Sequence, residues 1–189
     1  IINGGPGMNS EGFIPLAKLL ASNTNHQTII FDQRGTGKSV LKDLNKYSVT
    51  MDLMVTDMEQ LRQKLGFENW IVMGHSFGGM LAAYYATKHP ERIKGMILSS
   101  SGGLDLELFS YIDINAKLTK EQQKQVNHWS RKISWGDTTY HARLQRGLNL
   151  APAYLYDKSY IPVVAERLTQ VNTAVNSLVF RDMQRMDFD

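Results

Sequence analysis

The pattern of apolar and polar residues along the chain predicts strands that alternate with helices. Short apolar runs have the length of buried strands, and between them apolar residues recur every three or four positions, as on one face of a helix. Strand, helix and strand in succession make a right-handed crossover in a parallel sheet, so the pattern predicts an α/β fold. The apolar runs are at 1–2, 28–31, 69–73 and 93–98. The clearest helical stripe consists of Met51, Met54, Val55, Met58, Leu61 and Leu65.

Residues that favour the ends of helices support this interpretation. Thr50 is a suitable N-terminal cap for the helix with the methionine stripe, and Gly66 is typical of its C-terminal end. Pro90 ends the helix after the third apolar run, because proline has no N–H to donate. A further helical stripe runs from Phe13 to Leu20. We therefore expect helices between successive strands of one sheet.

The character of the chain changes near Leu104, because no further strand pattern appears and Gln, Asn, Lys and Tyr become frequent. Thr119 and Gln122 have the spacing of a capping box, in which each side chain bonds the other's backbone N–H. The helices expected there are at 119–132, 138–150 and 163–183. We predict a partial α/β core at 1–103 and a helical cap at 104–186.

The third apolar run leads into a serine between two glycines, which predicts a nucleophile elbow. Gly74 and Gly78 leave room for a turn so tight that the Ser76 hydroxyl is exposed above the sheet. The N–H of Phe77 lies at the start of the next helix, where unpaired donors can hold an oxyanion. An ordinary turn between a strand and a helix is the alternative. The strand before the motif and the alanine-rich helix after it favour Ser76 as a nucleophile.

Residues 3–7 form a glycine-rich loop directly after the first apolar run. Such a loop lets backbone amides approach a ligand closely. Gly5 is the expected donor, with Gly4 as a further candidate, because Pro6 has no N–H. A plain Gly/Pro loop remains the alternative.

The segment after the second apolar run resembles the end of a phosphate loop. Gly37, Lys38 and Ser39 match that end, but the first glycine of the motif is replaced by Asp32, whose carboxylate would repel a phosphate. A phosphate-loop nucleotide binder is therefore the less favoured function. We predict a structural loop held by Asp32 and Arg34.

Composition limits the other classes of function. The chain of 189 residues is 42% hydrophobic and 21% charged, with a net charge of +3, which is ordinary for a globular domain. Its basic residues are scattered, so no nucleic-acid track is predicted, and no apolar run reaches the roughly 18 residues of a membrane span. Cysteine is absent, which excludes a thiol nucleophile and a cysteine metal site. We expect no metal or cofactor. The compartment stays open, with a cytoplasmic location favoured.

Three motifs in order resemble the α/β-hydrolases, and among them the proline iminopeptidase (prolyl aminopeptidase) family. The segment 3–7 looks like that family's oxyanion loop, the segment 32–39 like its Asp-Gln-Arg-Gly loop, and the segment 74–78 like its elbow. The resemblance covers residues 1–103 well and the cap loosely. It implies an α/β-hydrolase fold with a helical cap, of which this chain holds an incomplete part.

The resemblance also implies roles. Ser76 is the nucleophile, and the amides of Phe77 and Gly5, with Gly4 possible, form the oxyanion hole. The family's order of serine, acid and histidine leads us to expect the triad acid and base beyond this chain, so the fragment alone should be inactive. Asp105, just beyond the fourth apolar run, is an alternative acid, although a solvated loop aspartate is the favoured interpretation of this residue.

The implied substrate is a small peptide from which an N-terminal residue, such as proline, is released. A free α-ammonium in a partly dry site needs a carboxylate partner, for which Glu166 and Asp187 are the candidates. A carboxylesterase that acts on an ester is the alternative in the same superfamily. The oligomeric state stays open.

Overall fold

A computed structural model describes residues 1–103, 111 and 113–186 of the chain. The chain divides into two compact units. The core unit consists of residues 1–108 and 171–189, and the helical unit consists of residues 109–170.

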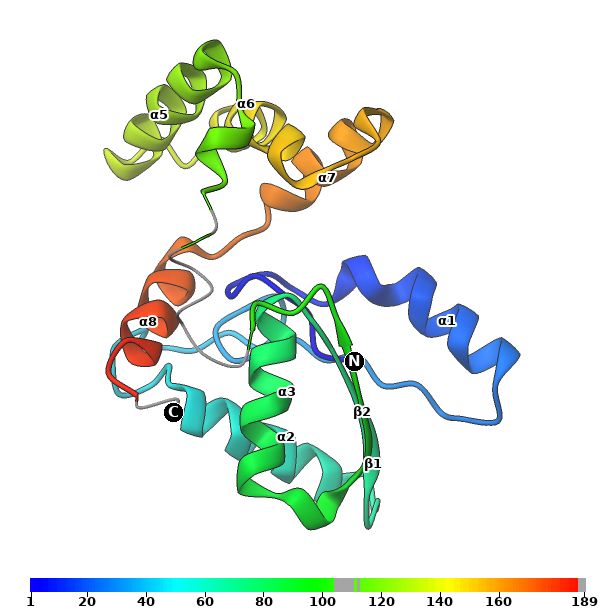
Figure 1. Cartoon of the computed structure of the whole chain (residues 1–189). Helices are drawn as coiled ribbons and strands as arrows, with labels where there is room; N and C mark the ends of the chain where they lie inside the picture. Colours follow the sequence, from blue (N-terminus) through cyan, green and yellow to red (C-terminus); the bar gives the residue numbers. More distant parts are fainter. Residues whose placement is uncertain (104–110, 112, 187–189) are drawn as a thin grey trace. The chain divides into compact units, whose positions relative to one another are not determined.

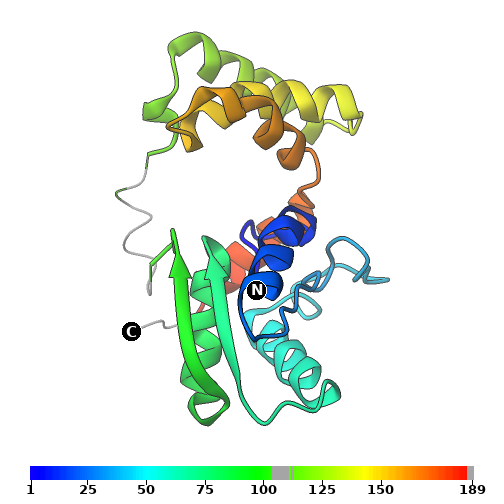
Figure 2. The ribbon, with the colours of Figure 1, turned by 90° about the vertical axis from the view of Figure 1, so that its right-hand side faces the viewer.

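The sheet of the core unit contains two parallel strands, β1 (Trp70–His75) and β2 (Ile93–Ser99). Both end at the same edge, because His75 is paired with Ser99 (Figure 2). Ile2 extends the pairing through a parallel bridge, in which its N–H donates to Met73 O at 2.7 Å and its carbonyl accepts from His75 N at 3.1 Å. The predicted parallel sheet is confirmed for the third and fourth apolar runs.

The prediction of a strand at 28–31 is wrong, because the structure describes this segment and shows no strand in it. This segment is half-buried, and the Ile1 amino group donates a hydrogen bond to Ile29 O at 2.6 Å. A strand requires a ladder of hydrogen bonds with a neighbour as well as apolar side chains. The local pattern identified a buried segment and could not show whether a partner pairs with it.

The described helices of the core unit agree with the predicted stripes. Thr50 caps α2, since its hydroxyl oxygen accepts from Leu53 N at 3.2 Å, and Gly66 adopts a φ of +74° after its end. The helices and turns are η1 (Glu11–Phe13), α1 (Ile14–Asn23), α2 (Met51–Lys64), α3 (Phe77–Lys88), η2 (Pro90–Arg92) and α8 (Thr173–Met183).

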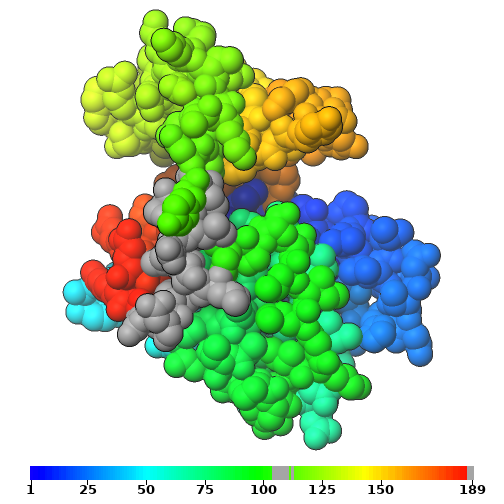
Figure 3. Space-filling view, in the orientation of Figure 1, coloured from blue at the N-terminus to red at the C-terminus, as the bar shows by residue number. Residues whose placement is uncertain are grey.

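Three helices and one face of the sheet enclose the hydrophobic core. In Figure 1, α2, α3 and α8 lie on one side of the strands and α1 lies on the other. Met58 from α2, Tyr85 from α3 and Val179 from α8 are each fully buried. Asp182 joins α8 to α2, because its carboxylate accepts from Met51 N at 2.8 Å, and Figure 3 shows the red α8 beside the cyan segment that leads into α2. The core thus fixes α8 against the elements that carry the candidate site.

The helical unit has a small apolar core of its own. Leu118, Val126, Leu150 and Ala153 are buried together. Its elements are η3 (Asn115–Lys117), α5 (Lys120–Ser134), α6 (Tyr140–Leu150), η4 (Ala151–Tyr154), η5 (Lys158–Tyr160) and α7 (Ile161–Leu168). The capping box predicted for α5 is present, because Thr119 and Gln122 each accept from the other's backbone N–H.

The single helix expected at 163–183 is wrong, since α7 ends at Leu168 and α8 begins at Thr173. Asn172 separates them, because its side-chain oxygen accepts from the N–H groups of Ala174 and Val175 and so starts a new helix. The range predicted for the cap, 104–186, also differs from the compact helical unit. That unit ends at residue 170, and α8 belongs to the core unit.

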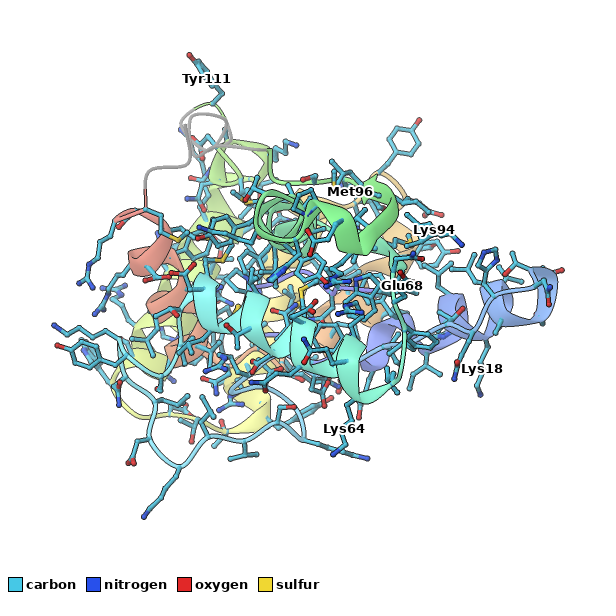
Figure 4. The ribbon with its side chains drawn as sticks, turned by 90° about the horizontal axis from the view of Figure 1, so that it is seen from below. Lys18, Lys64, Glu68, Lys94, Met96 and Tyr111 are labelled. Atoms are coloured by element: carbon cyan, nitrogen blue, oxygen red, sulfur yellow. The ribbon has the colours of Figure 1, made fainter. Side chains whose placement is uncertain are left out.

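Two basic side chains of the core unit lie on its surface. Lys18 and Lys64 point into solvent in Figure 4, on two different helices. Within the described residues, no helix has the length and apolar character needed to cross a membrane.

Candidate active site

Ser76 lies in a strained turn between β1 and α3. Its φ of 53° and ψ of −124° fall outside the common regions for a residue with a side chain, which is typical of a functional turn. A Cβ on Gly74 would lie 2.2 Å from Gly78 O, and one on Gly78 would lie 2.2 Å from Ile2 O. Positions 74 and 78 can therefore hold only glycine in this geometry.

Hydrogen bonds brace the backbone of Ser76 from both sides. Its N–H donates to Ser99 O at 3.0 Å, at the end of β2. Its carbonyl accepts from Gly79 N at 2.9 Å and from Gly102 N at 3.2 Å. The end of the neighbouring strand and the loop after it thus hold the strained residue, whose side chain is only half-buried.

The glycine-rich loop passes directly beside this serine. A Cβ on Gly4 would lie 2.9 Å from Ser76 Cβ, so only glycine permits this approach. Gly5 follows with a φ of +139° and is exposed. In the part of the chain that the structure describes, no acceptor pairs with the N–H of Gly5 or of Phe77. The structure thus brings together the two loops that carry the predicted residues.

Two buried polar side chains hold the glycine-rich loop through hydrogen bonds to its backbone. Asn3 is 2% exposed, and its Nδ2 donates to Met8 O at 2.8 Å and to Gly4 O at 3.1 Å. Gln33 is equally buried and donates from Nε2 to Asn3 O at 2.7 Å. The loop at 32–39 therefore supports the loop at 3–7.

Asp32 organises the loop at 32–39. Its Oδ1 accepts from Ser10 N at 2.8 Å and from Ser10 Oγ at 2.9 Å, and its Oδ2 accepts from Lys38 N at 2.8 Å. Burial acts to raise the pKa of this carboxyl, but these hydrogen bonds outweigh it and hold the pKa below its usual range. A Cβ on Gly37 would lie 2.1 Å from Asp32 Oδ2. The carboxylate thus occupies the inside of the turn, where a phosphate loop would hold its phosphate.

Arg34 fastens the same loop to α2. Its Nε and Nη2 donate to the two oxygens of Asp57 at 2.7 and 2.6 Å, and its Nη1 donates to Ser48 O at 2.8 Å. The predicted structural loop held by Asp32 and Arg34 is confirmed.

Asn172, the N-cap of α8, and Asn176 within α8 together contact both loops, and our sequence interpretation missed them. The N–H of Asn172 donates to Gly7 O at 2.8 Å, and its Nδ2 donates to Gly35 O at 2.9 Å. Asn176 Nδ2 donates to Pro6 O at 2.9 Å. Asparagine's preference for the N-cap position could have indicated the helix start at 172, but no local signal indicates these long-range bonds.

In the described residues, no hydrogen bond connects a histidine to Ser76. His75 is 3.3 Å from Ser99 Oγ through Nδ1, and its ring centroid is 5.7 Å from that of Phe13. The ring of His89 contacts Tyr85. His128 and His141 belong to the helical unit, and His26 is exposed.

Of the three carboxylates singled out in the sequence, Glu166 lies within the described residues. Glu166 is exposed on α7 and accepts a hydrogen bond from the Tyr140 hydroxyl, which raises the pKa of that tyrosine. Asp187 and Asp105 lie outside the described residues.

Comparisons with known proteins identify relatives of this chain. A proline iminopeptidase of Neisseria gonorrhoeae is 38% identical over 97 residues, which are 51% of this chain and 30% of that protein. The match thus spans less than a third of the relative's length.

Two solved structures are similar in fold. A proline iminopeptidase from Mycobacterium smegmatis has a TM-score of 0.54 at 24% identity, covering 87% of this chain and 59% of its own. A thermophilic esterase from Thermogutta terrifontis has a TM-score of 0.63 at 16% identity, covering 97% of this chain and 62% of its own.

The family model described as alpha/beta hydrolase fold matches residues 1–175, which is most of the chain. The predicted resemblance is confirmed, with proline iminopeptidases among the relatives. The chain belongs to the alpha/beta hydrolase fold family.

Proposed function

We propose that the intact protein is a serine hydrolase of the proline iminopeptidase type, with Ser76 as its nucleophile. The observation that carries this proposal is the strained backbone of Ser76, together with the N–H groups of Phe77 and Gly5, which have no acceptor among the described residues. A positive φ at a non-glycine residue is costly, by about 1–3 kcal/mol, and persists where the surrounding structure enforces it. The braces from Ser99 and Gly102 are of that enforcing kind.

The proposed reaction proceeds through an acyl-enzyme. Ser76 Oγ attacks the carbonyl carbon of the scissile bond while a general base takes its proton, and the carbonyl oxygen becomes an oxyanion. The N–H groups of Phe77 and Gly5, with that of Gly4 as a further candidate, donate to the oxyanion. Collapse of the tetrahedral intermediate expels the amine, which takes the proton, and water then hydrolyses the acyl-enzyme. In the described residues, no histidine makes a hydrogen bond with Ser76, so the proposal requires a base from another part of the intact protein.

A peptide with a free N-terminus is the proposed substrate, and the helical unit is the proposed cap. Similarity to proline iminopeptidases supports this choice over an ester. Glu166 is the described candidate for binding the α-ammonium, because one of its oxygens accepts from Tyr140 and no hydrogen bond in the described chain uses the other. Asp187 is the second candidate.

Covalent labelling tests the nucleophile. The intact protein that carries this chain is treated with a fluorophosphonate, and the adduct is mapped by mass spectrometry. We expect the adduct on Ser76 and its loss in Ser76→Ala. Ser99→Ala is the matched control, because it removes a hydroxyl near the same turn and should leave labelling intact. Labelling that persists in Ser76→Ala would contradict the proposal.

Magnesium-dependent nucleotide binding tests the alternative function, a phosphate-loop nucleotide binder. The position of Asp32 inside its own turn argues against a phosphate there. We expect no binding of ATP or GTP by calorimetry. Binding that is lost in Lys38→Ala would favour the nucleotide binder.

A further inference from the structure

We propose that Asn172 and Asn176 are positioning residues that hold the glycine-rich loop in the geometry required for oxyanion binding. This inference rests on the proposed function, because it gives α8 a task in the same reaction. It concerns residues far along the chain from the three motifs that identify the family.

The start of α8 is in close backbone contact with the glycine-rich loop. A Cβ on Gly7 would lie 2.5 Å from Asn172 O and 3.2 Å from Asn176 N, so the loop can approach the helix only through glycine. Gly7 also has a φ of +94°. The carbonyl of Gly7 accepts from Asn172 N at 2.8 Å. These contacts fix the loop immediately after Gly5 and Pro6.

The two side chains extend this attachment to both loops of the site. Asn176 Nδ2 donates to Pro6 O, which directly follows Gly5, at 2.9 Å. Asn172 Nδ2 donates to Gly35 O at 2.9 Å, and Gln33 from the same loop donates to Asn3 O at 2.7 Å. The glycine-rich loop is therefore held by α8 after Gly5 and by the loop at 32–39 before it.

The helix itself is a rigid support. Val175, Val179 and Met183 on α8 are fully buried in the core, and Asp182 accepts from Met51 N. A loop attached to such a helix keeps its amides in place without reorganisation during the reaction. Because oxyanion donors act only in the transition state, their misplacement should lower kcat and leave KM nearly unchanged.

Two variants remove these hydrogen bonds and are chosen so that α8 can still fold. Asn176→Ala removes the bond to Pro6 and places a strong helix former inside the helix. Asn172→Ser keeps an oxygen that can cap α8 but is too short to donate to Gly35. Ser177→Ala is the matched control, since Ser177 is an exposed neighbour on the same helix. All are made in the intact protein, with active sites counted by fluorophosphonate titration.

We expect kcat per active site for an aminoacyl-naphthylamide to fall by about tenfold in each asparagine variant, with KM within about twofold. Ser177→Ala should match the parent. A purely stabilising role would lower the melting temperature and leave kcat per active site unchanged, and that result would overturn the proposal.

Hydrogen exchange gives a readout that does not depend on activity. Amides in residues 3–10 should exchange about tenfold faster in Asn176→Ala than in the parent, because the opening of the loop becomes easier. Unchanged exchange in both asparagine variants would overturn the proposal. The hydrolytic activity of Ser76→Ala is measured in parallel. Full hydrolysis by that variant would contradict the proposed function. The exchange rates would still decide whether the two asparagines hold the loop.

Discussion

Gly4 lies against Ser76 so closely that a Cβ on Gly4 would be 2.9 Å from Ser76 Cβ and 3.0 Å from His75 O. The glycine-rich loop and the elbow are therefore in direct contact at this point. Gly5, which is exposed, directly follows Gly4 and is therefore one residue from this contact, and the proposed oxyanion hole requires such closeness.

Gly4→Ala should displace the loop from the elbow. We expect at least a tenfold loss of kcat/KM in the intact protein, because a shift of about 1 Å is enough to cost that much. Overpacking should also lower the free energy of unfolding by about 1–3 kcal/mol. Gly95→Ala in β2 is the control, since a Cβ there meets only Ile71 side-chain carbons at 3.9 and 4.0 Å. Equal activity of the two variants would show that the contact is unimportant.

Asp32→Ala should destabilise the fold by removing three hydrogen bonds to its carboxylate. Loss of the acceptor leaves the two donors of the buried Ser10 without partners, and we expect a decrease of about 2–3 kcal/mol in the free energy of unfolding. Chemical denaturation of the intact protein measures it. Asp43→Ala, at an exposed position nearby, should change this free energy by less than about 0.5 kcal/mol.

Glu59 should make stability depend on acid pH. Hydrogen bonds from Arg62, against the effect of burial, and from Tyr85 lower the pKa of Glu59 from an ordinary value of 4.5 to about 2. Its folded pKa is thus below its unfolded value. The stabilisation is complete above about pH 4.5 and is lost as the pH falls through about 2.

Denaturation midpoints between pH 6 and pH 2 test this dependence. The difference between the parent and Glu59→Gln should be largest at pH 6 and should shrink toward pH 2. Glu68→Gln, which changes an exposed carboxylate, is the control. A difference that is constant with pH would mean that Glu59 does not titrate in this range.

Glu166→Gln should raise KM for an aminoacyl-naphthylamide by about tenfold or more, since it removes a charged partner of the α-ammonium. An uncharged ester of similar size should keep its KM. Tyr140→Phe is the matched variant, because it removes the hydrogen bond to Glu166 and leaves the carboxylate charged. Asp187→Asn tests the second candidate in the same way. Efficient ester hydrolysis, indifference to these changes and no cleavage of prolyl-naphthylamide would assign the protein to the carboxylesterases.

The elements that could be predicted are those whose signals are local. Thr50, the methionine stripe and Gly66 define α2 within a short stretch of chain, and the structure agrees with each of them. The glycines on either side of Ser76 predicted a tight turn. The structure agrees, because a Cβ on Gly74 would lie 2.2 Å from Gly78 O and one on Gly78 would lie 2.2 Å from Ile2 O. The fold family followed from such motifs.

The errors concern contacts between distant segments. The apolar run at 28–31 indicated burial, but strand pairing depends on a partner that the run itself does not specify. The helix expected at 163–183 followed from continuous periodicity, and the cap at Asn172 divides it. A residue that favours both helix caps and loops gives an ambiguous local signal.

The sequence by itself determined the glycines, the caps, the serine turn and the family to which they belong, because each is a steric or hydrogen-bonding requirement of neighbouring residues. Only the tertiary structure decided that Gly4 touches Ser76, that Asp32 fills its own turn, and that Asn172 and Asn176 hold both loops. Those contacts join segments far apart in the chain. They form when burial of the core brings α8 against α2, and no local pattern of residues specifies that approach.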